Sequence, residues 1–395
     1  MKTISPILAV TAMTLRALGQ RLPSSLVSVI GIAGVVMIFV GVLSISEGFR
    51  RTLELAGSDQ VAVILRGGAS SEMASSFGPD QVQIIKQAPG VAQDENGPIA
   101  SAELFTAVDQ IKRSTNTGAN APLRGIEPAG VRTREHFKLI AGRMFETGRN
   151  EVIVGRAAAQ TLIGLDVGSS VKWGNNIWQV VGMFSDDGSV AESEIWTDTR
   201  TLQSAYSLGG TVQTVRAKLD SPAAFADFKN HLTADPRLNV TVQTEHQFYA
   251  DQSSTLTTIV RSAGTVLALL MGIGAVFGAL NTMYSAVSSR GPEIATLRAL
   301  GFGGVPVIVS VMVESLLLGL LGGTLGAAIA WLGFDGLQTS TLNFSSFSQV
   351  SFAFSVTPAL MITAIVYAVL LGLAGGFFPA IHAVRQPIIE GLRRS

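Results

Sequence analysis

Hydrophobic positions gather in four long runs, and a stretch of mixed polarity separates the first run from the other three. Residues 23–46 carry no charged side chain, and further apolar runs occupy residues 258–286, 305–334 and 356–381. Each run supplies the ~20 residues that a helix needs to cross a bilayer. The first run is longer than the apolar core of a cleaved signal peptide, and Ser44–Glu47 is a poor cleavage site. The pattern therefore favours an uncleaved first helix and predicts a membrane protein with four transmembrane α-helices.

The mixed stretch, residues 47–257, alternates short segments typical of strands and of helices. Val61–Leu65 is a run of apolar, mostly branched residues that indicates a strand. Ser221, followed by Pro222, marks the start of a helix. We therefore expect a large α+β domain in two lobes between the first and second membrane helices. The pattern leaves the element boundaries within residues 66–140 open.

The positive charges beside the four runs predict the orientation of the chain. Lys and Arg flank the runs on the side of both termini and of the connection 287–304, whereas the short loop 335–355 carries none. Cytoplasmic loops are enriched in Lys and Arg, so the termini and residues 287–304 are predicted to be cytoplasmic. The domain 47–257 and the loop 335–355 are then periplasmic. Residues 1–22 are expected to be an amphipathic segment on the membrane surface, and residues 382–395 a cytoplasmic tail.

No proline and no turn cluster interrupts the chain between Phe248 and Arg290. One helix is therefore expected to run from the outer domain through the second membrane span. At 1.5 Å per residue such a helix would be roughly 60 Å long. It would offer a mechanical link between the outer domain and the connection 287–304.

The segment Arg290–Gly301 is predicted to be a short polar helix between two apolar runs. Pro292 suits the first helical turn, where a missing N–H costs nothing, and Ser288 or Ser289 can cap the helix ahead of it. Gly301 is placed to close its C-terminus. The segment is too short to span a bilayer, so it must lie at the cytoplasmic surface.

Charge and apolar spacing leave two interpretations of this helix open. Glu293 lies toward the positive end of the helix dipole and Arg298 toward the negative end. Ile294, Leu297 and Leu300 are expected to share one short apolar face. Such a face fits an interfacial turn between membrane helices, and it equally fits a docking helix for a cytoplasmic partner.

The string from Pro292 to Phe302, Pro-Glu-Ile-Ala-Thr-Leu-Arg-Ala-Leu-Gly-Phe, resembles the EIGTLRALGA signature of the MacB/FtsX-like ABC transporter permeases. The segment 141–182 resembles the periplasmic core domain of the same permeases, and the ending 376–393 resembles theirs as well. The similarity covers nearly the whole chain in the order that the family has, and it is least typical at residues 66–140.

The resemblance implies a permease subunit of the mechanotransmission type. In that family, ATP closes the dimer of a separate ATPase subunit, the ATPase pushes on the short helix, and the motion rearranges the periplasmic domains of two permease copies. The implied result is the extrusion or release of a substrate from the periplasm or the membrane. The resemblance assigns ATPase docking to Pro292, Glu293, Ile294, Thr296, Leu297, Arg298, Leu300 and Gly301.

The implied partners are an ABC ATPase subunit, membrane lipid, and a second copy of the chain in a homodimer or a related permease in a heterodimer. In Gram-negative relatives a periplasmic adaptor and an outer-membrane channel complete the route.

The alternative function is an ABC-coupled scaffold or sensor that controls an extracytoplasmic partner such as a cell-wall hydrolase. Both functions place the chain in the bacterial inner membrane. No lined pocket is evident from the sequence of the outer domain, so the substrate is left open.

Composition and motifs exclude several other functions. The chain has 395 residues, of which 47% are hydrophobic and 14% charged, with a formal net charge of +0. Without a basic stripe, nucleic acid is not an expected partner. The absence of cysteine excludes disulfides and thiol catalysis. The chain carries no P-loop, its four histidines are scattered, and no catalytic motif is present, so we expect no enzyme, no metal site and no cofactor bound by this chain.

Small residues and one acid stand out within the spans. Glycines four residues apart let helix backbones approach closely in lipid, and packing within the chain is favoured over a homodimer seam as their purpose. The pairs are Gly274/Gly278, Gly319/Gly323, Gly322/Gly326 and Gly372/Gly376. Glu314 is the acid within a span, and a hydrogen bond to a neighbouring helix is favoured over a proton relay for it.

Overall fold

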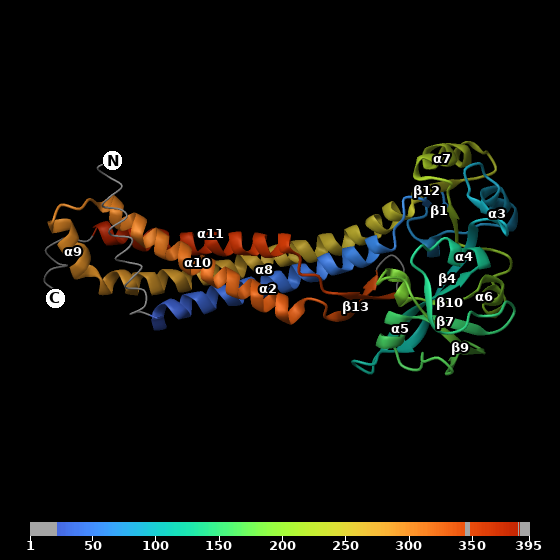
Figure 1. Ribbon diagram of the computed structural model, residues 1–395, viewed down its shortest axis with the longest axis horizontal. Helices are drawn as coiled ribbons and strands as arrows, with labels where there is room; N and C mark the ends of the chain where they lie inside the picture. The colour runs from blue at the N-terminus through green and yellow to red at the C-terminus, as the bar shows by residue number, and fades with distance from the viewer. Residues whose placement is uncertain (1–21, 344–347, 386, 388–395) are drawn as a thin grey trace. The chain divides into compact units, whose positions relative to one another are not determined.

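The computed structural model describes residues 22–343, 348–385 and 387 (Figure 1). It divides into two compact units. We call the first, Gly48–Thr258 with Gln338–Ala353, the outer domain, and the second, residues 1–47, 259–337 and 354–395, the membrane unit. The predicted amphipathic segment 1–22 lies, except for its last residue, outside the described residues, as does most of the predicted tail beyond Arg385.

Within the described part of the chain, four helices are long and apolar enough to cross a membrane. They are α2 (Leu22–Leu55), α8 (Glu245–Ser289), α10 (Gly304–Phe334) and α11 (Pro358–Arg385). The predicted fold class, four membrane helices with a large domain between the first two, is confirmed. The helices extend past the predicted spans, most of all α2, which continues to Leu55, and α8, which begins at Glu245. The expected uninterrupted helix before Arg290 is therefore present.

The membrane helices pack closely against one another, and glycines allow several of these contacts. A Cβ atom on Gly326 would lie 2.5 Å from the carbonyl oxygen of Ala33 in α2. A Cβ on Gly323 would lie 2.7 Å from that of Ala368 in α11, and one on Gly372 would lie 2.5 Å from the carbonyl oxygen of Ser315. Real Cβ atoms do not approach this closely, so only glycine allows these contacts. Packing within the chain accounts for these predicted pairs.

The pair Gly274 and Gly278 on α8 is different. A Cβ atom added at either residue would meet no atom within 4 Å in the described part of the chain. Neighbouring apolar side chains on the same helix are also exposed, with Leu270 at 63% and Phe277 at 66%. In the membrane unit this face of α8 is therefore left to lipid or to another polypeptide.

One ten-stranded sheet forms the framework of the outer domain, in the order β12-β1-β11-β4-β5-β10-β7-β9-β6, with β8 paired to β9. The bounds are β1 (Val61–Arg66), β4 (Ala100–Ile111), β5 (Gly118–Ile126), β6 (Lys138–Gly142), β7 (Glu151–Gly155), β8 (Ser170–Trp173), β9 (Asn176–Ser185), β10 (Ile195–Asp198), β11 (Thr214–Lys218) and β12 (Val240–Thr244). A separate short pair is β2 (Gln93–Asp94) with β3 (Gly97–Pro98).

Short helices cover this sheet and surround it. They are η2 (Glu72–Ala74), α3 (Pro79–Lys86), α4 (Pro128–Arg132), α5 (Arg156–Thr161), η3 (Val190–Ser193), α6 (Thr199–Ala205), η4 (Pro222–Ala224) and α7 (Phe225–Ala234). The predicted strand at Val61–Leu65 and the predicted helix start at Ser221 are both confirmed.

Strand β4 joins two parts of the sheet, which we call the lobes of the outer domain. Its first residues, from Ala100, pair with β11, and the remainder, from Leu104 onward, pairs with β5. Separate apolar cores lie in the two parts. One includes Ile64 and Phe228, and the other includes Trp178.

The predicted short loop 335–355 is a β-hairpin over most of its described length, which corrects the expectation of a plain loop. Strands β13 (Gln338–Asn343) and β14 (Ser348–Ala353) pair antiparallel and belong to the outer domain. The backbone N–H of Ser351 donates to the Ser193 hydroxyl at 2.9 Å. Phe352 is buried, with its ring edge against Phe49 at 5.7 Å. Because β14 has two apolar residues buried on the outer domain, the hairpin is a structural part of it.

Candidate functional site

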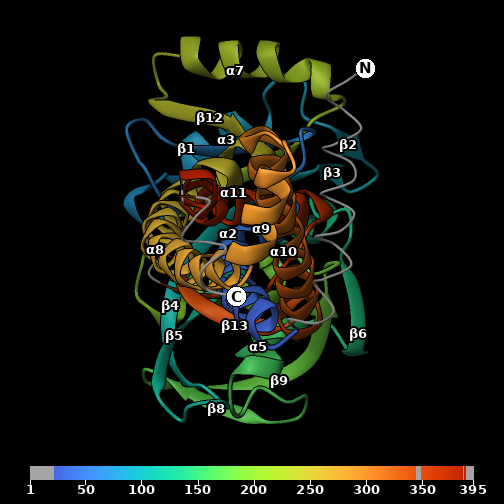
Figure 2. The same ribbon diagram turned by 90° about the vertical axis from the view of Figure 1, so that its left-hand side faces the viewer.

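The predicted docking helix is α9 (Gly291–Ala299), which lies at one end of the helix bundle (Figure 1), the end that faces the viewer in Figure 2. Pro292 is in its first turn, as predicted. Its C-terminus closes on Gly301, whose φ of +91° is in the left-handed region. Gly301 N–H donates to the carbonyl of Arg298 and Phe302 N–H donates to that of Leu297, both at 3.1 Å. This pair of bonds is the Schellman motif, so Gly301 ends the helix as the sequence predicts.

The predicted cap at the other end is wrong. Ser288 and Ser289 belong to the last turn of α8, where the Ser289 hydroxyl donates to the carbonyl of Ala286. Arg290 occupies the N-cap position, with φ −100° and ψ 6°, and its side chain makes no capping bond. Because α8 continues to Ser289, one residue remains for the change of direction into α9.

The predicted common face of Ile294, Leu297 and Leu300 is also wrong. Ile294 packs against a buried cluster of the membrane unit that includes Met283 and Val311. Leu300, by contrast, is 72% exposed. Ile294 and Leu300 lie on different sides of the helix, because residues six positions apart are separated by about 120° around the helix axis.

Three residues on one side of α9 and its C-cap residue, Leu300, form a surface that we call the docking face. Glu293 and Thr296 are exposed, Leu297 is half-buried, and Leu300 follows them on the same side. Ala295 is buried on the opposite side. Of the predicted docking residues, the structure therefore turns Ile294 inward and keeps Glu293, Thr296, Leu297 and Leu300 outward. Pro292 and Arg298 are half-buried, and Gly301 is exposed.

A buried ion pair connects the start of α9 to α10. Arg290 Nη1 lies 3.2 Å from Glu314 Oε2, and the two side chains are 12% and 6% exposed. Arg290 Nε also lies 3.5 Å from Glu293 Oε2. The sequence predicted a hydrogen bond from Glu314 to a neighbouring helix, and the structure places such a bond at Arg290, the residue between α8 and α9.

The outer domain contains a second set of charged residues that the sequence analysis missed. Three guanidinium groups and four carboxylates are buried together, and we call them the buried charge cluster. Its members are Arg124, Arg134, Arg216, Glu72, Glu103, Glu194 and Glu245. The available signal was a charged residue inside an apolar strand, as in Val215-Arg216-Ala217.

Arg124, from β5, is at the centre of this cluster. Its guanidinium makes paired hydrogen bonds to Glu72 at 2.8 and 2.9 Å and to Glu194 at 2.8 Å each. It also bonds Glu103 at 3.1 Å. Burial by itself would raise the pKa of Glu72, but the charge and hydrogen bonds of Arg124 outweigh burial and lower this pKa to about 2. The carboxylate of Glu72 is therefore ionised at physiological pH.

The cluster connects both lobes to the start of α8. Arg216 of β11 pairs with Glu245, the first residue of α8, and donates to the Tyr249 hydroxyl at 3.3 Å. The same guanidinium lies 3.2 Å from Glu103 on β4. Since breaking a buried ion pair is costly, these contacts hold the first turn of α8 firmly to the sheet.

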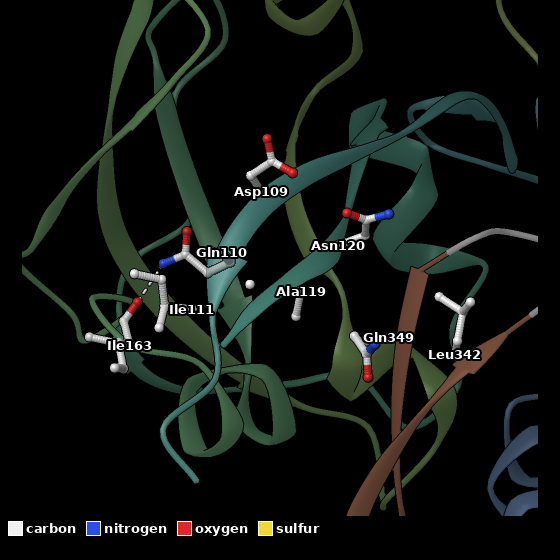
Figure 3. Close-up of a pocket in the computed structure, with 9 residues that line it drawn as sticks. Asp109, Gln110, Ile111, Ala119, Asn120, Ile163, Leu342 and Gln349 are labelled. Atoms are coloured by element: carbon white, nitrogen blue, oxygen red, sulfur yellow. Dashed lines mark hydrogen bonds between the residues drawn. The ribbon is translucent and has the colours of Figure 1, made fainter. Parts of the chain in front are cut away.

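A groove of about 610 Å³ opens between β4–β5 and the hairpin (Figure 3). Ala119 and Asn120 of β5 line one side, and Leu342 and Gln349 of the hairpin line the other. Asp109 brings a carboxylate to a lining that is otherwise uncharged among the described residues. The sequence showed no lined pocket in the outer domain, because one wall comes from the hairpin more than two hundred positions later in the chain.

Among described residues, no group of three or more His, Cys, Asp or Glu is placed to hold a metal ion. Known protein families match most of the chain. Residues 25–235 match the MacB-like periplasmic core domain, and residues 265–388 match the FtsX-like permease C-terminal region. The chain belongs to the MacB/FtsX-like permease family. The permease is therefore an ABC transporter permease subunit with a periplasmic core domain, and a multi-pass inner-membrane protein.

Similar proteins are described as export ATP-binding/permease proteins or as ABC transporter permeases. The macrolide export ATP-binding/permease protein MacB of Bdellovibrio bacteriovorus is 23% identical over 399 residues, covering 93% of this chain and 58% of that protein. An uncharacterized ABC transporter permease protein of Mycobacterium tuberculosis is 28% identical, covering 64% of this chain and 30% of that protein. The chain spans little more than half the length of the first relative.

Among solved structures, the periplasmic region of MacB from Actinobacillus actinomycetemcomitans matches 53% of the permease and 95% of that chain, with 13% identity and a TM-score of 0.37. The extracellular domain of the noncanonic ABC-type transporter YknZ from Gram-positive bacteria matches 47% of the permease and 98% of that chain, with 16% identity and a TM-score of 0.35.

Proposed function

We propose that the permease transmits ATP-driven motion of an ABC ATPase to its outer domain, and that this motion extrudes or releases a periplasmic or membrane substrate. The ATPase is a separate subunit that binds ATP, so the permease itself performs no catalysis and binds no cofactor. The observation that carries the proposal is α9, a short closed helix with an exposed docking face at the end of a membrane helix that starts in the outer domain.

Support for ATPase docking comes from the exposed side chains of α9. Leu300 exposes 72% of its surface at the end of a helix whose opposite side is buried. An exposed leucine flanked by Glu293 and Thr296 provides an apolar anchor with a polar rim, which is the usual anatomy of a protein interface. The Lys and Arg distribution supports a cytoplasmic location for this face, with both termini on the same side.

Replacement of Leu300 by Asp tests the docking. Because Leu300 is largely exposed, Leu300→Asp should leave the permease folded, while a desolvated acid at the centre of the interface should weaken ATPase binding by about 10- to 100-fold. The full-length tagged permease is purified from its native membranes, and the co-purifying P-loop ATPase is quantified by mass spectrometry and ATP hydrolysis.

Leu300→Met is the matched control, because it keeps an apolar side chain of similar volume and should retain the ATPase. Leu297→Asp should act in the same direction as Leu300→Asp. ATPase recovery that is equal for Leu300→Asp, Leu300→Met and the unmodified permease would refute docking through this face.

We also propose that two permease copies pair, as a homodimer, along the face of α8 that carries Gly274 and Gly278. Support comes from the contrast with the other glycine pairs, which are filled by neighbours within the chain. In lipid, exposed glycines at this spacing favour close helix pairing.

The chain has no cysteine, so a single Gly274→Cys substitution reports pairing by disulfide cross-linking. Adding Gly278→Ile should abolish the cross-link, whereas Gly333→Ile, at another open glycine, should not.

The alternative function, a scaffold that controls a cell-wall hydrolase, would use the same docking and differs outside the membrane. Export predicts co-purification of a periplasmic adaptor and an outer-membrane channel. Scaffolding predicts a hydrolase bound to the outer domain. The groove between β5 and the hairpin favours a small-molecule substrate, because a volume of about 610 Å³ is typical of such sites.

A further inference from the structure

Arg290 is the residue at which three helices of the membrane unit meet. Its backbone joins α8 to α9, since Arg290 N–H donates to the carbonyl of Val287 at 3.1 Å and its own carbonyl accepts from Ile294 N–H at 2.9 Å. Its side chain reaches Glu314 on α10 at 3.2 Å. One residue therefore connects the end of α8, the first turn of α9 and the body of α10.

Arg290 forms ion pairs with Glu314 and with Glu293, and the contact to Glu314 is the stronger of these. Glu293 is 53% exposed and lies 3.5 Å away, so water and salt weaken this pair. Glu314 is 6% exposed and is closer. A carboxylate in a membrane span is unfavourable unless an opposite charge lies near it, so the guanidinium of Arg290 stabilises Glu314, and removing either side chain breaks a buried ion pair.

The position of Glu314 along α10 makes the contact mechanically useful. It lies about 15 Å beyond the start of the helix at Gly304, at 1.5 Å per residue. A turn at residues 300–303 also joins α9 to α10, but this turn contains Gly301 and Gly303 and can bend. The ion pair adds a direct contact between the start of α9 and the body of α10.

We propose that Arg290 and Glu314 are positioning residues that clamp the docking helix to α10, so that a displacement of α9 moves α10 together with α8. The proposal rests on the proposed function, because it concerns how a push on the docking face is passed on. Without the clamp, α9 would still be attached to α8 by the chain and would still expose Leu300, but it would move relative to α10.

Hydrogen exchange on the full permease in lipid nanodiscs tests the clamp without any partner. Arg290→Met should speed exchange of the amides in Gly291–Leu300 at least tenfold, and Glu314→Gln should do the same. Glu293→Gln is the control, since it removes the exposed pair and should leave exchange unchanged. The charge swap, Arg290→Glu with Glu314→Arg, should restore much of the protection if the ion pair itself is responsible. Exchange in Arg290→Met that equals the unmodified rate would overturn the proposal.

A second readout separates clamping from general stability and from docking. Arg290→Met should still co-purify with the ATPase subunit, but the permease should then have little effect on the rate of ATP hydrolysis. The charge swap should restore the effect of the permease on this rate. Loss of binding in Leu300→Asp together with full coupling in Arg290→Met would refute the clamp and leave docking intact. Retained binding in Leu300→Asp would refute docking through α9, whatever the exchange results.

Discussion

The buried charge cluster predicts a large loss of stability when its central guanidinium is removed. Arg124→Met keeps the length and much of the volume of the side chain but removes five hydrogen bonds to Glu72, Glu103 and Glu194, made at 2.8–3.1 Å. Their side chains are 7%, 0% and 8% exposed, so water cannot replace the lost donors. Breaking a buried ion pair in this way costs about 3–5 kcal/mol.

For a domain of about 200 residues, each kcal/mol corresponds to a shift in melting temperature of about 2–4 °C. Arg124→Met should therefore lower the melting temperature of the outer domain by about 6–20 °C. Tryptophan fluorescence of the full permease reports this transition, because Trp173, Trp178 and Trp196 lie in the outer domain. The indole N–H of Trp196 donates to Glu194 at 2.7 Å, so its signal also reports the cluster directly.

Arg149→Met is the matched control. Arg149 pairs with Glu146 at 3.0 Å, but the two side chains are 65% and 54% exposed. An exposed pair of this kind contributes little to stability, so the melting temperature should hardly change. Equal shifts in melting temperature for Arg124→Met and Arg149→Met would refute the claim that burial makes the ion pairs of Arg124 important for stability.

Two further predictions concern acid and membrane packing. The pKa of Glu72 is lowered from 4.5 to about 2, so its contribution to stability is present above pH 4.5 and is lost as the pH falls toward 2. Arg124→Met should move this loss to higher pH, as measured by fluorescence melts between pH 2 and 7. In the membrane unit, Gly326→Val should destabilise by more than the ~1–3 kcal/mol of ordinary overpacking, because it meets the Ala33 backbone, while Gly333→Val should be tolerated. Thermal aggregation in detergent would separate these two variants.

Local patterns in the sequence were enough to predict much of this architecture. Apolar runs of membrane length predict the four spans, because in lipid a chain must form its hydrogen bonds within each helix. The absence of proline before Arg290 predicts the long helix α8, and Gly301 predicts the end of α9 because it tolerates a φ of +91°. The eleven residues from Pro292 carry the resemblance that family membership confirms.

Long-range contacts decided the rest. The strands β4 and β5 fall within the stretch where the sequence placed no boundaries, and β5 takes its partners from residues far apart in the chain. The hairpin β13–β14 could not be recognised as part of the outer domain, because its buried face is covered by residues such as Phe49 and Ser193. No local pattern records a surface contributed by distant segments.

The same distinction applies to the candidate site. The sequence determined which residues of α9 are polar, where the helix ends, and that Glu314 needs a partner, because these follow from propensity and from the cost of a charge in lipid. Only the tertiary structure decided that Ile294 turns inward, that Leu300 turns outward, and that Glu314 pairs with Arg290. Side-chain direction and pairing depend on which helices pack together, and that packing is a property of the folded chain as a whole.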